Sequence, residues 1–162
     1  MTNWTALFSA LGADPANWVG PDDEENRKHL PRYLFLRQAW RNVVAEGDNE
    51  WIGNEIANAR EKPCEPYAGI GLALERLRSN GASDADIGEV VRGMQGQLLF
   101  RFTYLLSDPE LDDPALEAAG FSELGWTLVE TDPEFRPTTR VVGNLHESVL
   151  TTEPTGREMR PA

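Results

Sequence analysis

The side chains of this 162-residue chain that could carry out chemistry gather near its C-terminal end. His146 and Glu147 are neighbours, and a histidine beside a carboxylate can act in general acid–base catalysis. Neighbouring residues on a helix point about 100° apart, so the pair does not easily line one narrow pocket. Glu147 would serve as a base only if it were buried. The alternative for His146 is a structural role, such as bonding a helix end.

Two arginines follow this pair in a segment that is dense in specific polar side chains. The segment 151–162 lacks the repetitive composition of a disordered tail, and Thr155-Gly156 indicates a defined turn. We therefore expect much of it to pack against the body, with Arg157 and Arg160 as candidates for recognition. The alternative is a frayed chain end.

Arg101 is a third candidate for binding, because the residues 98–105 around it are almost all apolar. A buried arginine needs a carboxylate or several carbonyl groups, since an unpaired buried charge is very unfavourable. The functional interpretation is a pocket that holds an anion. The structural interpretation is a paired core arginine, or one whose guanidinium reaches the surface.

Metal and cofactor sites are not expected. The two histidines, His29 and His146, and the single Cys64 form no zinc motif. The acidic stretch from Asp108 fails the calcium-loop template, which needs glycine at the sixth position and glutamate at the twelfth. Those positions hold Asp113 and Ala119, so a solvated loop is the better interpretation. No phosphate-binding loop or serine-nucleophile elbow is present either.

The charge balance disfavours two classes of partner. Asp and Glu number 27 against 15 Lys and Arg, which gives a net charge of −12. Such a surface repels nucleic acid and anionic membranes, whereas it attracts a basic protein. Most of the cations are arginines, so intramolecular arginine–carboxylate pairs are expected on the helix surfaces.

The apolar pattern predicts a mainly α-helical fold, a bundle of five or six helices with a small C-terminal β-hairpin. We expect one domain over 1–162, with a helical body over about 1–120 and the hairpin, a short helix and a packed tail over about 121–162. No secretory leader or membrane-spanning run is visible, so a cytoplasmic location is expected.

Caps and breakers set the expected elements. A first helix is capped by Thr2 and ends at Gly12, and 15–26 is a connector that carries a solvated acidic run. Further helices are expected at about 31–45, 49–60 and 66–79, and from the Ser83 cap to about 106. Pro31 takes the first position of the helix at 31–45. In the helix at 66–79 one apolar stripe contains Tyr67, Ile70, Leu74 and Leu77. A helical turn at 114–119, strands at 126–131 and 138–142, and a short helix at 144–150 complete the prediction.

The segment 98–106 allows two interpretations. Leu98, Phe100, Phe102 and Tyr104 alternate with period two, as in a strand, but they also continue the helical stripe that starts at Ser83. We favour a helix. Since it is apolar on nearly every side, we expect it to be the buried core element.

These features favour a non-enzymatic, acidic protein-binding or regulatory module, resembling in its properties a bacterial immunity protein of the cytoplasm. One alternative is a small enzyme whose site includes His146, Glu147 and Arg157. Another is a structural homodimer that associates through an exposed apolar patch.

Overall fold

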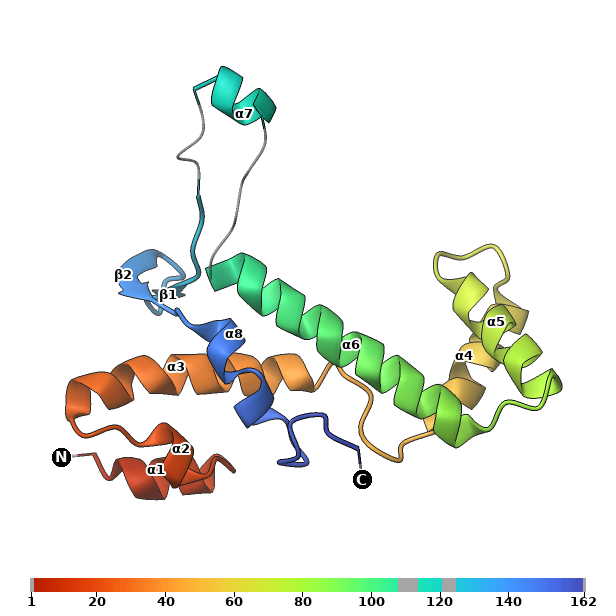
Figure 1. Cartoon of the computed structure of the whole chain (residues 1–162), viewed down its shortest axis with the longest axis horizontal. Coiled ribbons are helices and arrows are strands. Elements are labelled where there is room, and N and C mark those ends of the chain that lie inside the picture. The colour runs from red at the N-terminus through yellow and green to blue at the C-terminus, as the bar shows by residue number, and fades with distance from the viewer. Residues whose placement is uncertain (1, 108–113, 121–124, 162) are drawn as a thin grey trace. The chain divides into compact units, whose positions relative to one another are not determined.

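The computed structural model describes residues 2–107, 114–120 and 125–161 (Figure 1). By its internal contacts the chain falls into two compact units, which are described separately: unit 1 contains residues 1–42 and 97–162, and unit 2 contains residues 43–96. The prediction of a mainly helical chain with a C-terminal hairpin is confirmed. The expectation of a single domain over 1–162 stays a prediction.

Unit 1 begins with three helices. They are α1 (Trp4–Ala10), α2 (Pro15–Trp18) and α3 (Asp23–Trp40). Each starts at a side chain that accepts a hydrogen bond from the first turn, namely Asn3, Asp14 and Asp22. The first helix is therefore capped by Asn3, and the prediction that Thr2 caps it is wrong.

The acidic run was wrongly predicted to be part of a connector. Asp22 is the N-cap of α3, and its carboxylate accepts a hydrogen bond of 2.9 Å from the amide of Glu25. The acids of the first turn also interact favourably with the positive end of the helix dipole. Pro31 consequently lies inside α3 and does not start a helix at that point.

An aromatic cluster joins these three helices. Phe8, Trp18 and Tyr33 are all buried, and their ring centroids lie between 5.0 and 6.3 Å apart. The Tyr33 hydroxyl donates a hydrogen bond of 3.0 Å to the carbonyl of Leu11, so its polar end is satisfied at the edge of the cluster.

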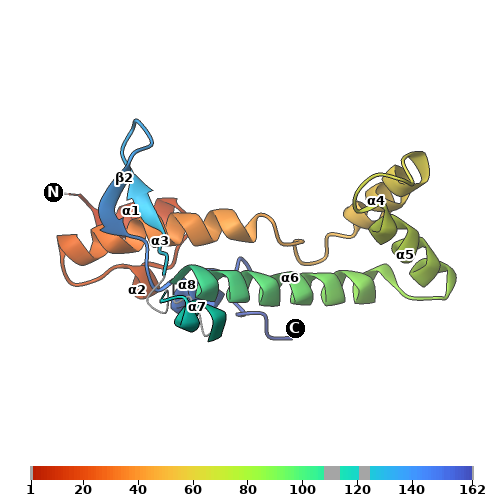
Figure 2. The same ribbon diagram turned by 90° about the horizontal axis from the view of Figure 1, so that it is seen from above.

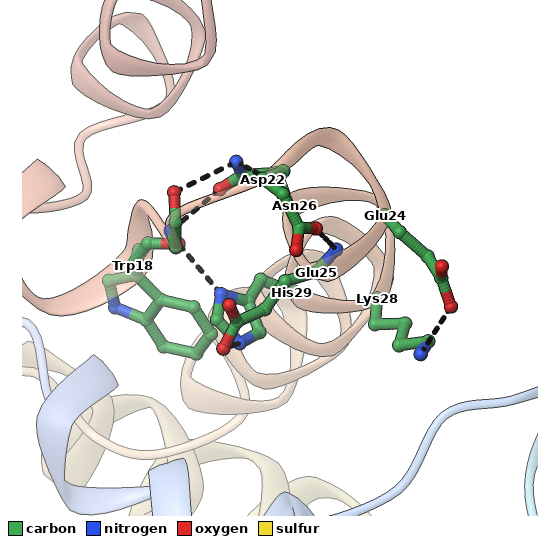
Figure 3. Close-up of polar contacts among 8 residues, drawn as sticks. Trp18, Asp22, Glu24, Glu25, Asn26, Lys28 and His29 are labelled. Atoms are coloured by element: carbon green, nitrogen blue, oxygen red, sulfur yellow. Dashed lines mark hydrogen bonds and ion pairs between the residues drawn. The ribbon is translucent and has the colours of Figure 1, made fainter.

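Buried polar contacts fix the turn between α2 and α3 (Figure 3). The Asn26 amide is 3% exposed and donates to the carbonyls of Gly20 and Asp22, while its oxygen accepts from the Gly20 amide at 2.8 Å. His29 Nδ1 lies 2.9 Å from the Trp18 carbonyl oxygen, and its Nε2 lies 3.7 Å from a Glu25 oxygen. His29 is thus occupied by local structure.

The rest of unit 1 comes from the second half of the chain. It contains the C-terminal part of α6 (Asp84–Ser107), α7 (Pro114–Ala118), the strands β1 (Val129–Thr131) and β2 (Pro137–Val141), α8 (Leu145–Ser148) and the 3-10 helix η1 (Leu150–Thr152). The strands pair in antiparallel fashion, with Val129 opposite Val141. The predicted hairpin is confirmed, although β1 starts at Val129 and not at residue 126. The acidic stretch 108–113, expected to be a solvated loop, lies outside the described residues.

Unit 2 is a helical hairpin followed by the start of α6. Its helices α4 (Glu50–Glu61) and α5 (Ala68–Ser79) pack closely, as Figure 2 shows. Its core contains Ile52, Ile56, Leu74 and Ile87. The Ser83 cap is confirmed, since its hydroxyl accepts from the Asp86 amide. Of the predicted stripe on α5, only Leu74 is buried, while Tyr67, Ile70 and Leu77 are exposed, because the closely packed position on this helix is Gly71.

The segment 98–106 is helical, as favoured above, but its predicted burial is wrong. Thr103 is the buried residue of this segment, at 1% exposure. The large apolar side chains that surround it are exposed, namely Leu98, Phe100, Phe102, Tyr104 and Leu105.

Candidate functional site

The short helix α8 carries the predicted catalytic pair. Leu145 and Val149 at its two ends are fully buried, and the Leu145 amide donates to the Ser107 hydroxyl at 3.1 Å. The Trp40 indole N–H donates a buried hydrogen bond of 2.8 Å to the Val149 carbonyl. These contacts attach α8 to α3 and to the end of α6, and thereby fix the positions of the residues between them.

His146 packs against Tyr104 of α6, with ring centroids 4.8 Å apart. Its Nδ1 is buried and has no hydrogen-bond partner among the described residues. No hydrogen bond between His146 and Glu147 is found among the described residues either. Direct proton transfer needs hydrogen-bond reach or one bridging water. The arrangement therefore favours a packing role for His146, and the enzyme hypothesis stays a prediction.

Arg32 of α3 is the charged group that faces Glu147, and sequence reasoning did not select it. Burial lowers the pKa of the Arg32 guanidinium, whereas the nearby negative charge of Glu147 raises that pKa. The Arg32 Nε atom is buried without a hydrogen-bond partner among the described residues. Glu147 thus offsets part of the free-energy cost of burying the Arg32 guanidinium, which is a structural role for this carboxylate.

The C-terminal segment is built around a buried carboxylate. Glu153 is 3% exposed and accepts hydrogen bonds from the Thr155 amide, the Thr155 hydroxyl and the Arg157 amide. This turn gives physical support to the expectation that the segment packs, although Arg160 remains largely exposed and pairs with Glu158 at 2.6 Å. Both predicted recognition arginines therefore belong to a structured segment.

Arg101 lies elsewhere, on the exposed side of α6. The predicted anion pocket depended on its burial, so that interpretation is wrong. Helical geometry explains its surroundings: Leu98, Tyr104 and Leu105 are three or four residues away and share its face, and Phe100 and Phe102 flank it at about 100° on either side. These five exposed apolar residues are named the α6 apolar face.

Sequence reasoning missed this face because periodicity shows which side chains are apolar but not what covers them. A helix that is apolar on all sides is normally buried in its own chain. The one available signal was Arg101 itself, since a central core position rarely carries an arginine.

Unit 2 has a shallow hollow of about 320 Å³ between α4 and α5. Ile56 and Ala57 line it together with Arg60, Glu75 and Arg78. Arg60 pairs with Glu75, and Arg78 holds Asp84 through two hydrogen bonds of 2.6 and 2.7 Å. The cations at this hollow are thus already paired with carboxylates.

Among the described residues, no helix combines the length and apolar character needed to cross a bilayer. Comparisons with protein-family models, curated proteins and solved structures find no match for this chain.

Proposed function

We propose that this protein is a protein-binding module and that the α6 apolar face is its docking surface. The observation that carries the proposal is the exposure of large apolar side chains on one short stretch of helix. Leu98 is 54% exposed, Phe102 is 52% exposed and Leu105 is 43% exposed. A phenylalanine can bury roughly 150–250 Å², so Phe102 alone leaves about half of such an area uncovered.

Single exposed apolar residues are common on protein surfaces and need no explanation. A contiguous patch is different, because large exposed apolar patches mark sites of protein or membrane interaction. The five side chains of the α6 apolar face are contiguous, since they lie within eight residues of one helix. A protein partner is favoured over a membrane because the net charge of −12 disfavours an anionic lipid surface.

Trp126 extends the surface beyond the helix. Its indole N–H donates a hydrogen bond of 2.8 Å to the carbonyl of Leu105, and its side chain is 43% exposed. Aromatic residues are enriched at protein interfaces, where they often supply much of the binding energy. The hydrogen bond holds Trp126 beside the end of the α6 apolar face, so a partner can contact both.

The test is site-specific photocrosslinking in cells of the source organism. A benzoylphenylalanine is introduced at Leu98 or Phe102, and at Phe135 as the matched control. Phe135 is an aromatic residue in the hairpin turn that is 86% exposed, so it reports on general surface contact. We expect discrete covalent adducts from positions 98 and 102 and none from position 135.

A melting curve for each variant checks that the substitution leaves the fold intact. If folded variants give no adduct at 98 and 102, or give the same adducts at 135, the α6 apolar face is not a docking surface and the proposal fails.

A further inference from the structure

Resting on the proposed function, we infer that the partner is a different protein, which covers the α6 apolar face with an apolar groove and pairs Arg101 with a carboxylate at the centre of that groove. A second copy of this chain does not have this chemistry.

The first observation is the position of the cation. Successive residues of an α-helix are about 100° apart, so Phe100 and Phe102 lie on either side of Arg101. Leu98 lies one turn before Arg101, and Leu105 lies one turn after it. Both residues are exposed. Any surface that covers these apolar side chains must therefore also cover the Arg101 guanidinium.

The second observation is that Arg101 has no carboxylate partner among the residues that the structure describes. In the described part of the chain it makes no hydrogen bond or ion pair. Elsewhere in the described part of the chain, ion pairs with carboxylates are made by other arginines, among them Arg27, Arg60, Arg78, Arg136, Arg140 and Arg160. Arg37, Arg41 and Arg76 also show no ion pair in the described part of the chain, so what distinguishes Arg101 is its place at the centre of an apolar face.

Binding of a partner would remove water from the Arg101 guanidinium. A guanidinium that is taken out of water without a counter-charge is strongly unfavourable, whereas a bidentate carboxylate satisfies both its charge and its donors. An apolar partner without an acid would therefore bind poorly. A partner with a carboxylate opposite Arg101 gains both affinity and specificity from this ion pair.

A second copy does not supply this acid. Dimers with twofold symmetry bring the same patch of both subunits together, so two Arg101 side chains would share one contact surface. The segment 97–107 contains no Asp or Glu that could separate them. Each copy also carries a net charge of −12, which adds a repulsion between copies.

The width of the face indicates a groove. Phe100 and Phe102 are about 200° apart around the helix axis, while a helix that packs on a single surface buries a stripe of roughly 100°. Two elements that flank α6 would contact both rings. This arrangement corresponds to the insertion of an amphipathic helix into a hydrophobic groove.

The experiment combines charge variants at Arg101 with the crosslinker at Leu98. Arg101→Lys keeps the positive charge and serves as the matched control, and Arg101→Glu reverses it. We expect the Lys variant to lose partner affinity and adduct yield, but by less than the Glu variant, because a lysine keeps the positive charge and cannot offer the bidentate donors of the guanidinium. For the Glu variant we expect a loss of at least tenfold, because two carboxylates would then face each other without water.

The partner is then identified by mass spectrometry of the adduct and purified, and the acidic residue nearest to its crosslinked position is changed to lysine. This reversal should restore binding to Arg101→Glu. Equal binding of wild type and Arg101→Glu would overturn the inference, and so would an adduct of twice the chain mass that forms from purified protein alone. In either case adducts at position 98 still exist, so the proposed function survives, whereas an absence of adducts removes both.

Discussion

Asp132 shows how a single carboxylate organises a turn in this protein. Its oxygens accept hydrogen bonds from the amides of Glu134 and Arg136, both at 3.0 Å, and from Arg136 Nε at 2.8 Å. These donors favour the charged form, so they lower the pKa of the Asp132 carboxyl, with the Arg136 amide as the largest cause. The Asp132–Arg136 turn is thus coupled to the ionisation of this group.

The coupling predicts a pH response with a defined sign. A carboxyl whose pKa is lowered on folding stabilises the fold above its unfolded pKa, and this contribution is lost as the pH falls through the folded pKa. The turn should therefore loosen below the usual value of 3.8. NMR shifts of the Glu134 and Arg136 amides should move with a midpoint below that value. In Asp132→Asn the transition should be absent, and a midpoint at or above 3.8 in the wild type would contradict the assignment.

At the scale of elements, the pairing of α4 with α5 depends on one close contact. Gly71 is buried, and a Cβ atom at this position would clash with the Glu55 carbonyl oxygen. The helices can approach this closely only because residue 71 has no side chain.

Gly71→Ala should therefore destabilise unit 2 by about 1–3 kcal/mol, the usual cost of overpacking a core. Gly69→Ala is the matched control, since it lies on the same helix and has no atom within 4 Å of its added Cβ. Chemical denaturation followed by circular dichroism gives both values. The control should be neutral or stabilised by up to ~1 kcal/mol, because alanine is the better helix former. A similar loss in both variants would show that the contact at residue 71 is not the cause.

The attachment of α8 makes a second prediction about elements. Trp40→Phe removes the indole donor and leaves the buried Val149 carbonyl without its partner. We expect a loss of about 1–3 kcal/mol in the free energy of unfolding, which is the usual cost of an unsatisfied buried polar group. Hydrogen exchange should accelerate at α8 and η1 more than at α1. Unchanged exchange at α8 would mean that this bond does not hold the helix.

The sequence contained enough information for the elements with strong local signals. Ser83 followed by Asp86 identified the start of α6, and the β-hairpin was found from its strand residues and turn. The start of α3 had a comparable signal in Asp22 followed by Glu25, but the proline at 31 drew the predicted start downstream. The exposure of 98–105 could not be predicted, because helical periodicity is the same whether an apolar residue faces its own core or another protein.

At the scale of the whole molecule, the acidity bears on association rate. In the proposed complex, the net charge of −12 would attract a basic partner over long distances, and the α6 apolar face and Arg101 would determine how long the complex lasts. The two effects are separable. Long-range attraction is screened by salt, whereas a buried ion pair is screened much less.

For the purified partner, the association rate constant should therefore fall several-fold between about 50 and 500 mM NaCl, as surface plasmon resonance can measure. Arg101→Lys should leave this salt dependence unchanged. An association rate that is insensitive to salt would show that the acidity serves solubility and does not steer a partner.

The discontinuity of unit 1 has a consequence for synthesis on the ribosome. Trp40 and Val149 are 109 positions apart, and all of unit 2 is encoded between them. At roughly 5–20 residues per second, the indole of Trp40 waits about 5–20 s for its acceptor. In that interval α4 and α5 are already complete, while the N-terminal helices lack the strands and α8. The nascent protein therefore exposes the helices α1 to α3 for longest, and these are the part that a chaperone on the ribosome would meet.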